Sequence, residues 1–231
     1  MELRTKGIFY CVGVGPGDPE LVTQKGVRTL EACPVLAAPR TKSGEMLALD
    51  IAQKAAELGD KVIVPLDFSM TRDEKRRWEE YETGAQTIAG YLEAGQDVAM
   101  VNLGDVSIYA TCTRMAERIK ELGFSVCMIP GVPSFCAVAA RLGESLTAEG
   151  EPLHIFPAGI SDLDRALELE GTKVLMKSGR QLPGVLEALD RAGALERSAL
   201  VENCGLPEER VVAPLEKGTE SGYFSTIVVK E

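Results

Sequence analysis

Residues 8 to 129 alternate between short apolar runs and segments in which apolar side chains recur at helical spacing. The run from Val98 to Val101 is apolar throughout, which is typical of a strand that is buried on both faces. Leu103-Gly104-Asp105 follows this run as a turn, and a segment with helical spacing comes next. Because strands and helices that alternate in this way pack into layers, the pattern predicts an α/β fold with a mostly parallel sheet.

Five strands and four helices are expected in this part of the chain. The predicted strands cover residues 8–14, 34–38, 61–64, 98–101 and 125–129. The predicted helices between them cover residues 18–33, 43–59, 71–95 and 107–123. Asp18, Ser43 and Ser107 can cap three of these helices, and Thr71 with Glu74 has the spacing of a capping box.

Pro130-Gly131-Val132-Pro133-Ser134 interrupts the alternation. It predicts a boundary between an N-terminal α/β domain of residues 1–129 and a C-terminal domain of residues 130–231. Ser134 should cap a short apolar helix, and further helices are expected over residues 161–169 and 181–192. The expected strands, which make the second domain α+β with a mixed sheet, cover residues 153–157, 173–177, 199–203, 209–215 and 223–230. The last two of these strands can pair antiparallel across a short loop.

The composition excludes several classes of function. The chain has 231 residues and a formal net charge of −10, and contacts with phosphate supply most nucleic-acid affinity, so a general nucleic-acid binder is not expected. Six cysteines without C-x-x-C spacing and a single histidine, His154, give no support for a metal site; reduced thiols in a cytoplasmic protein are expected instead. No long uncharged apolar segment predicts a membrane span, and residues 1–7 are too short and polar for a signal peptide.

A glycine-rich loop, Gly13-Val-Gly15-Pro-Gly17-Asp18, separates the first predicted strand from the first predicted helix. A dinucleotide site, and with it a nucleotide-dependent oxidoreductase, is one interpretation. However, the third glycine of G-x-G-x-x-G falls at Asp18, and Pro16 lacks a backbone N–H that a pyrophosphate would use. An acidic residue at a helix start also repels phosphate, so the loop favours a ligand without phosphate groups.

The turn at Gly104-Asp105 is a second candidate ligand loop, because ligands bind at the carboxyl ends of strands in open α/β sheets. Glycine lets a ligand approach the backbone closely, and the aspartate adds a hydrogen-bond acceptor. An ordinary strand-to-helix turn is the alternative interpretation of this stretch alone.

Three motifs in this order and spacing resemble the tetrapyrrole methylases that use S-adenosylmethionine. They are Gly13-Val-Gly-Pro-Gly-Asp-Pro-Glu-Leu21, Gly104-Asp105 with Tyr109 and Thr111, and Pro130-Gly-Val-Pro-Ser-Phe135. The resemblance covers essentially the whole chain. Within this family the sequence is most similar to the precorrin-2 and cobalt-factor II C(20)-methyltransferases. It departs from the family pattern at Val106, Pro133 and Glu144-Ser145.

The resemblance implies a two-domain fold with a cofactor cleft between the domains, and a homodimer. It also implies methyl transfer from S-adenosylmethionine to carbon 20 of cobalt-factor II or precorrin-2 in cobalamin biosynthesis. Because the methyl donor is already activated, the protein has mainly to hold donor and acceptor carbon in line. By match to the motifs, cofactor contacts are implied for Pro16, Leu103, Gly104, Asp105, Val106, Ile108, Pro133, Ser134, Met176, Lys177, Asn203 and Pro214.

The implied substrate carries many carboxylates, so an acidic protein needs local basic residues to bind it. Candidates on loops or helix starts are Arg40, Lys42, Arg72 and Arg114, each with a solvated surface charge as the alternative. Tyr109 is a candidate for the group that accepts a proton from the methylated carbon, with simple packing as its alternative.

Other functions on the same fold stay open at this point. They include methylation of another tetrapyrrole carbon, of diphthine or of ribosomal RNA, and a non-catalytic tetrapyrrole carrier. The acidic charge opposes the RNA version, and a carrier would not need three cofactor loops.

Overall fold

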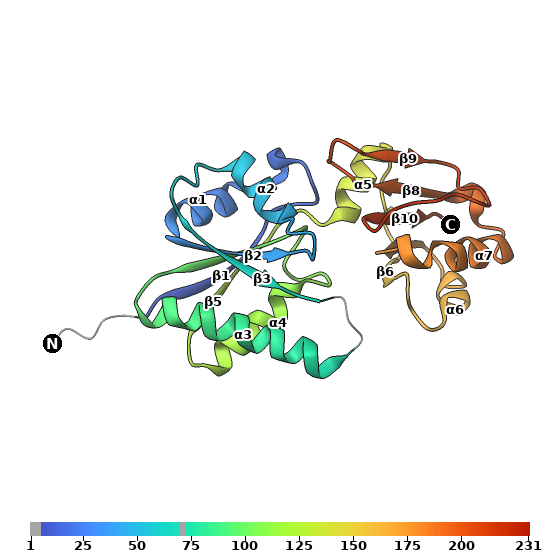
Figure 1. The fold of residues 1–231 in the computed structure, drawn as a ribbon. Coiled ribbons are helices and arrows are strands. Elements are labelled where there is room, and N and C mark those ends of the chain that lie inside the picture. Colours follow the sequence, from blue (N-terminus) through green and yellow to red (C-terminus); the bar gives the residue numbers. More distant parts are fainter. Residues whose placement is uncertain (1–5, 70–72) are drawn as a thin grey trace. The chain divides into compact units, whose positions relative to one another are not determined.

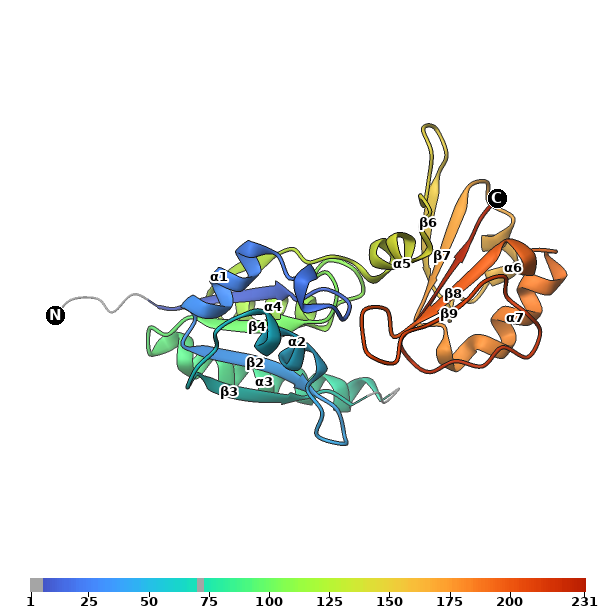
Figure 2. The same ribbon diagram turned by 90° about the horizontal axis from the view of Figure 1, so that it is seen from above.

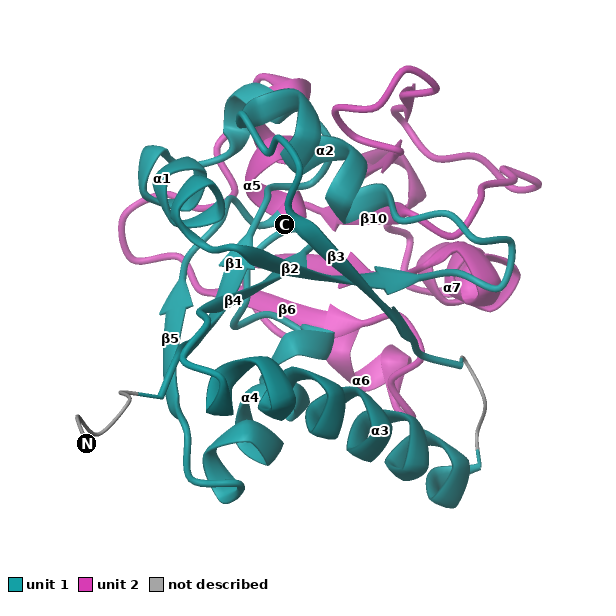
Figure 3. Cartoon of the chain, turned by 60° about the vertical axis from the view of Figure 1, so that its left-hand side comes forward, with its two compact units in different colours: residues 1–133 teal, residues 134–231 magenta. Residues whose placement is uncertain are grey.

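The computed structural model describes residues 6–69 and 73–231. Two of the sequence predictions, the capping threonine Thr71 and the basic residue Arg72, therefore lie outside the described residues. The chain divides into two compact units, residues 1–133 and residues 134–231, which Figure 3 shows in different colours. Residues 130–133, which follow the last strand of unit 1, belong to that unit.

Unit 1 contains a sheet of five parallel strands in the order β3-β2-β4-β1-β5 (Figure 1), which confirms the predicted α/β class. The strands are β1 (Ile8–Gly13), β2 (Val35–Arg40), β3 (Val62–Asp67), β4 (Val98–Asn102) and β5 (Ser125–Ile129). Every residue of β4 is buried, as its uninterrupted apolar run predicts for a central strand covered on both faces.

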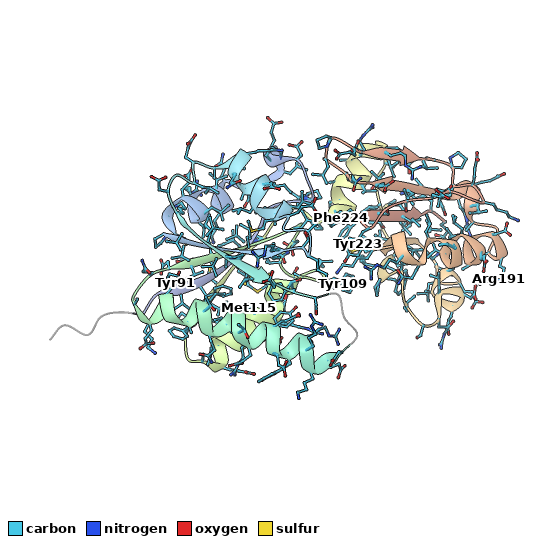
Figure 4. All side chains as sticks on the ribbon, in the orientation of Figure 1. Tyr91, Tyr109, Met115, Arg191, Tyr223 and Phe224 are labelled. Carbon is cyan, nitrogen blue, oxygen red and sulfur yellow. The ribbon has the colours of Figure 1, made fainter. Side chains whose placement is uncertain are left out.

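Helices cover both faces of this sheet (Figures 1 and 3). α1 (Gln24–Ala32) and α2 (Leu47–Ala55) pack through one aliphatic cluster against one face. α3 (Glu74–Glu93) and α4 (Thr111–Glu121) pack through a second cluster against the other, where Figure 4 labels the buried Met115.

The connections that leave β1 and β4 run in opposite directions. The chain passes from β1 across β4 to reach β2, and from β4 across β1 to reach β5. The helices of these two connections lie on opposite faces of the sheet. The carboxyl ends of β1 and β4 therefore mark the topological switch point, where open α/β sheets bind their ligands.

The predicted helix over residues 18–33 is wrong as a single element. Asp18 caps a short 3₁₀ turn, Pro19–Leu21, by accepting a hydrogen bond from the backbone of Glu20. α1 begins after Val22, with the Thr23 hydroxyl accepting a hydrogen bond from Gly26. Two capping side chains five residues apart divide the segment, because each takes up backbone donors that a continuous helix would use internally.

Two other predicted caps are also wrong. Ser43 donates its hydroxyl to the carboxylate of Glu45, and α2 begins at Leu47 without a side-chain cap. Ser107 hydrogen-bonds to Asp105, and α4 begins at Thr111, also without a side-chain cap. In both cases the serine hydroxyl donates to a carboxylate in the loop before the helix and does not cap the helix.

Unit 2 contains a mixed sheet of five strands in the order β6-β7-β10-β8-β9. The strands are β6 (Leu153–Pro157), β7 (Thr172–Met176), β8 (Ser198–Glu202), β9 (Arg210–Val212) and β10 (Ser225–Val229). α7 (Leu182–Arg191) packs on one face with the shorter α6 (Leu163–Leu167), and α5 (Ser134–Leu142) packs on the other.

The predicted pairing of the last two strands is wrong. β10 lies between β7 and β8 and pairs antiparallel with both, while β9 pairs with β8 at the edge (Figure 2). All five residues of β10 are buried, whereas those of β9 are largely exposed, so burial favours β10 in the centre of the sheet. None of the described helices is long and apolar enough to cross a membrane.

Candidate functional site

Three glycines meet backbone to backbone at the carboxyl edge of the unit 1 sheet. A Cβ added to Gly13 would lie 2.6 Å from the nitrogen of Gly131 and 2.7 Å from the oxygen of Gly104. A Cβ added to Gly131 would lie 2.4 Å from that same oxygen and 2.7 Å from the carbonyl carbon of Gly13. We call Gly13, Gly104 and Gly131 the glycine junction. It joins the loops after β1, β4 and β5 more closely than any residue with a side chain would permit.

A small antiparallel bridge adds a second link between the first two loops. Gly15 donates its N–H to the oxygen of Gly104 over 3.3 Å, and Gly104 donates to the oxygen of Gly15 over 2.7 Å. Both glycines have positive φ, at 74° and 73°, which other residues rarely adopt. Backbone pairing thus joins the loops after β1 and β4 at the switch point, and a ligand at this edge would rest on the joined loops.

Asp105 connects the loop after β4 to the loop after β5. One carboxylate oxygen accepts hydrogen bonds from the backbone and hydroxyl of Ser107, at 2.8 Å and 2.5 Å. The other oxygen accepts from the backbone N–H of Gly131 at 2.9 Å. The side chain is buried, with 9% of the residue exposed. Asp105 therefore connects the two loops. Any effect of Asp105 on ligand binding would act through the positions of Gly104 and Gly131.

The environment of Asp105 favours the charged carboxylate. Burial opposes ionisation, but hydrogen bonds from Ser107 and from the backbones of Gly131 and Val106 outweigh it, so the pKa of Asp105 lies below its ordinary value. The neighbouring Asn102 is also buried, and its amide donates to the oxygens of Leu103 and Asp105. These side chains hold the loop after β4 in one shape.

The loop after β1 does not offer a phosphate site. Pro16 is buried and has no N–H. The Asp18 carboxylate accepts the backbone N–H of Glu20 at the start of the 3₁₀ turn. The Thr23 hydroxyl accepts the backbone N–H of Gly26 at the start of α1. A pyrophosphate needs free N–H groups at a helix N-terminus, and here two of these groups already donate to the Asp18 and Thr23 side chains. The structure therefore gives the dinucleotide interpretation no support, whereas a ligand without phosphates fits.

The remaining predicted residues of the loop after β4 differ in exposure. The Val106 side chain is buried in the aliphatic cluster beneath α3 and α4, and its carbonyl accepts from the Thr113 hydroxyl. Leu103 and Ile108 are half-buried. Tyr109 has a φ of 48° and leaves 45% of its surface exposed (Figure 4). A tyrosine held at positive φ stores backbone strain, which is found most often at functional sites.

The predicted basic residues do not form one cluster. Arg40, at the end of β2, makes a bidentate ion pair with Asp67 at the end of β3, with distances of 2.9 Å and 2.7 Å. Lys42 is exposed in the following loop. Arg114, in the first turn of α4, lies over the ring of Tyr81. All three are at the carboxyl edge of the sheet, which is the edge of the glycine junction.

The predicted residues of unit 2 follow strand ends. Met176 is buried at the end of β7, and Lys177 after it has a φ of 59°. Asn203 follows β8 with a φ of 52° and donates its N–H to the oxygen of Phe224 at 2.9 Å. Ser134 begins α5 beside Thr226, with their hydroxyl oxygens 3.4 Å apart. Pro214 is exposed and follows a cis peptide bond, and Pro133 is half-buried at the end of unit 1.

Sequence reasoning missed two features of the site. The sequence pattern places Gly131 in a break and in the third motif, but it does not predict the backbone contact that makes Gly131 the third member of the glycine junction. Ser107 was read as a helix cap, but it holds Asp105. The spacing Asp-x-Ser, in which an aspartate accepts from the backbone two residues later, was a usable signal for this turn. The contact between Gly131 and Gly13 joins distant segments and has no local signal.

Comparison with known proteins identifies the family. The model of the Tetrapyrrole (Corrin/Porphyrin) Methylases matches residues 9–217. Cobalt-precorrin-2 C(20)-methyltransferase from Salmonella typhimurium is 30% identical over 97% of this chain and 97% of that protein. Precorrin-2 C(20)-methyltransferase from a Sinorhizobium species is 30% identical over 96% of this chain and 95% of that protein. The cobalamin biosynthesis protein CobIJ from Mycobacterium tuberculosis is 29% identical over 96% of this chain, which spans 46% of CobIJ, about half its length.

Solved structures share the fold. Uroporphyrin III C-methyltransferase from Thermus thermophilus matches in its native form with a TM-score of 0.72 and 25% identity, over 97% of this chain and 98% of that one. The same enzyme complexed with S-adenosylhomocysteine matches with a TM-score of 0.73 and 24% identity, over the same shares of both chains. Together with the family match over most of the sequence, the shared fold leads to one conclusion: the chain belongs to the tetrapyrrole (corrin/porphyrin) methylases.

Proposed function

We propose that this protein is an S-adenosylmethionine-dependent C-methyltransferase that acts on carbon 20 of cobalt-factor II or precorrin-2 in cobalamin biosynthesis. The observation that carries the proposal is the glycine junction at the switch point, in a chain of this family. Its support is the 30% identity, over nearly the whole chain, to relatives named as C(20)-methyltransferases of cobalt-precorrin-2 and precorrin-2.

The proposed role of the chain is to position two reactants. S-adenosylmethionine would supply an activated methyl group, so the protein needs no nucleophile of its own. The joined loops after β1 and β4 present backbone and apolar side chains rather than phosphate-binding donors, which suits an adenosyl sulfonium. The proposed cofactor contacts are Pro16, Leu103, Gly104, Val106, Ile108, Pro133, Ser134, Met176, Lys177, Asn203 and Pro214, with Asp105 acting through the loops.

The direct experiment is anaerobic incubation with S-adenosylmethionine and either cobalt-factor II (cobalt-sirohydrochlorin) or metal-free precorrin-2, followed by mass spectrometry and NMR of the product. We expect one added methyl group on carbon 20. Comparison of the two rates decides between the cobalt-containing and the metal-free substrate. No added methyl group with either compound, or a methyl group on another carbon, would contradict the proposal.

Tyr109 is proposed to act on the proton that leaves the methylated carbon. The proposal is supported by the exposure of Tyr109 and by its position after Gly104-Asp105, in the loop that leads from β4 to α4. Replacing Tyr109 by phenylalanine should lower kcat by about 100-fold, the usual contribution of a positioned proton-transfer group. Steady-state kinetics should show this with an unchanged Kd for S-adenosylhomocysteine.

Tyr91→Phe is the matched control, because Tyr91 packs on the apolar cluster of α3 and lies away from the loop after β4 (Figure 4). It should leave kcat within about twofold of the native value. Equal kcat values for the Tyr109 variant and the native protein would leave the Tyr109 ring with a packing role.

A homodimer and a cytoplasmic location complete the proposal. The homodimer is supported by the family resemblance, and light scattering after gel filtration measures it directly. The cytoplasmic location is supported by the cysteines, which are all free in the structure, with three of them buried.

A further inference from the structure

Two arginines of unit 1 lie near Tyr81. Arg77 precedes Tyr81 by one turn of α3, and Arg114 reaches it from α4, with its guanidinium carbon 6.0 Å from the ring centroid. Burial raises the pKa of Tyr81, and the charges of Arg114 and Arg77 oppose that rise, as expected for cations close to the phenol. The ring is itself held by Phe68, whose centroid is 4.7 Å away.

Arg77 and Arg114 differ from the arginines around them in their ionic contacts. Carboxylates hold the guanidinium groups of Arg40, Arg76 and Arg118 within 3.4 Å. Among the described residues, Arg114 has no carboxylate within 4.0 Å. The ion pair of Arg77 is a loose one, 3.7 Å from Glu74, whose side chain is 91% exposed. The Nε of Arg77 is buried without a hydrogen-bond partner among the described residues.

The position of these two arginines is unfavourable for the helices that carry them. Each lies among the first four residues of its helix, α3 or α4, where the positive end of the helix dipole repels a cation. α4 also starts without a side-chain cap. Among the described residues no ion pair offsets this cost at Arg114, and the pair of Arg77 with Glu74 is loose, which indicates a role toward a ligand.

Both helix starts lie at the carboxyl edge of the sheet, because α3 follows β3 and α4 follows the loop that contains Asp105. We infer that Arg77 and Arg114, which both lie near Tyr81, form a binding site for a peripheral carboxylate of the tetrapyrrole. Arginine suits this task because its planar guanidinium binds a carboxylate through two parallel hydrogen bonds. Aromatic contact with Tyr81 fixes the Arg114 guanidinium before the ligand arrives. The inference deepens the proposed function and rests on it.

The test compares the double variant Arg77→Gln/Arg114→Gln with Lys75→Gln/Lys120→Gln. Each removes two positive charges from α3 and α4, but Lys75 and Lys120 are exposed and lie outside the Tyr81 cluster. Equilibrium binding of cobalt-sirohydrochlorin is followed by quenching of the single tryptophan, Trp78. Each arginine should contribute about tenfold to Kd, the usual size of a charged hydrogen bond, so the arginine variant should bind about 100-fold more weakly. The lysine variant should change Kd by less than about threefold.

Three further readouts separate a binding site from a structural effect. Circular dichroism should show a thermal midpoint equal to or slightly above that of the native protein, because two cations leave the helix N-termini, and the Kd for S-adenosylhomocysteine should stay the same. The salt dependence of tetrapyrrole binding should be shallower in the arginine variant than in the lysine variant.

A conservative variant adds a further check. Arg77→Lys/Arg114→Lys, which keeps the charge without the planar guanidinium, should bind the tetrapyrrole with a Kd between those of the native protein and the arginine variant.

The outcomes distinguish this site from the proposed function. An equal Kd for the arginine variant and the native protein, or an equal loss in the lysine variant, would overturn the arginine site alone. Failure of the native protein to bind cobalt-sirohydrochlorin would overturn both. If the native protein binds the compound but transfers no methyl group to it, the proposed reaction fails while the binding data still decide the arginine site.

Discussion

Gly131→Ala is expected to disrupt the site more than any other single change, with a loss of about 3 kcal/mol in the stability of unit 1. The added methyl group would lie 2.4 Å from the Gly104 oxygen and 2.7 Å from the Gly13 carbonyl carbon, and both are backbone atoms of the sheet edge. No side-chain rotation can relieve these contacts, so a loop or a strand end must move. Binding of S-adenosylhomocysteine should be lost together with the packing of the loops.

A thermal scan by circular dichroism should show a midpoint lower by on the order of 10 °C. Hydrogen exchange should be faster in the peptides that contain β1, β4 and β5. Gly90→Ala is the matched control, because a Cβ at Gly90 meets nothing within 4 Å and the residue lies inside α3. That variant should be as stable as the native protein or more stable by up to about 1 kcal/mol. A Gly131 variant that melts and binds like the native protein would show that the junction is not a constraint.

Asp105→Asn is expected to weaken both stability and cofactor binding at neutral pH. The carboxylate accepts from Ser107 with one oxygen and from Gly131 with the other, and an asparagine amide can accept on one side only. The other donor would face an NH₂ group, at a cost of about 2 kcal/mol. Urea unfolding and calorimetry with S-adenosylhomocysteine measure the two effects.

The effect of Asp105→Asn should depend on pH in a definite direction. Because the folded-state pKa of Asp105 is lowered below its ordinary value of 3.8, the charged carboxylate contributes stability that is fully present above that value. This contribution is lost as pH falls through the folded-state pKa, where the protonated acid resembles the amide. The difference in stability between the native protein and the variant should therefore be constant from pH 7 to about pH 5 and shrink below pH 4. A difference independent of pH over this range would contradict the role given to the charge.

Asp97→Ala, which removes the hydrogen-bond acceptor, provides the comparison for cofactor binding. The Asp97 carboxylate accepts the backbone N–H of Ile8 at 2.7 Å, so it also links two strands, but at the amino edge of the same sheet. It should lower stability and leave the Kd of S-adenosylhomocysteine unchanged. An equal loss of affinity in both variants would show that general loosening of unit 1, rather than the joined loops, governs binding.

The sequence predicted the parallel sheet well because its information is local. An apolar run such as Val98–Val101 is fully removed from water only in a central strand, and the helical segments on either side leave few alternatives. Helix starts were predicted less well. Ser43 and Ser107 are good capping residues in isolation, but Glu45 and Asp105 compete for their hydroxyls within the loops. Such competition depends on loop geometry, which the sequence pattern does not contain.

The limits of prediction in unit 2 and at the site have a common cause. The position of β10 between β7 and β8 is a long-range pairing, and loop length alone suggested a neighbour nearer in sequence. In the same way, the motifs pointed to Gly13, Gly104 and Gly131 one by one, whereas their mutual contact depends on the order of the strands. The sequence pattern predicts a hydrogen-bond acceptor at Asp105, and the structure shows that this carboxylate joins the loop after β4 to the loop after β5.

The strand order of unit 1 also determines when the glycine junction can form during folding. β1 leaves the ribosome well before β4 and β5, which are the strands that it pairs with in the described part of the sheet. Contacts between such distant segments form slowly, because a long loop must close before any pairing is gained. Until then β1 is an apolar segment with unsatisfied edges, which is a substrate for chaperones or aggregation. Ligand binding at the joined loops would consequently report the completion of folding, and a ligand supplied during refolding should raise the yield of native protein.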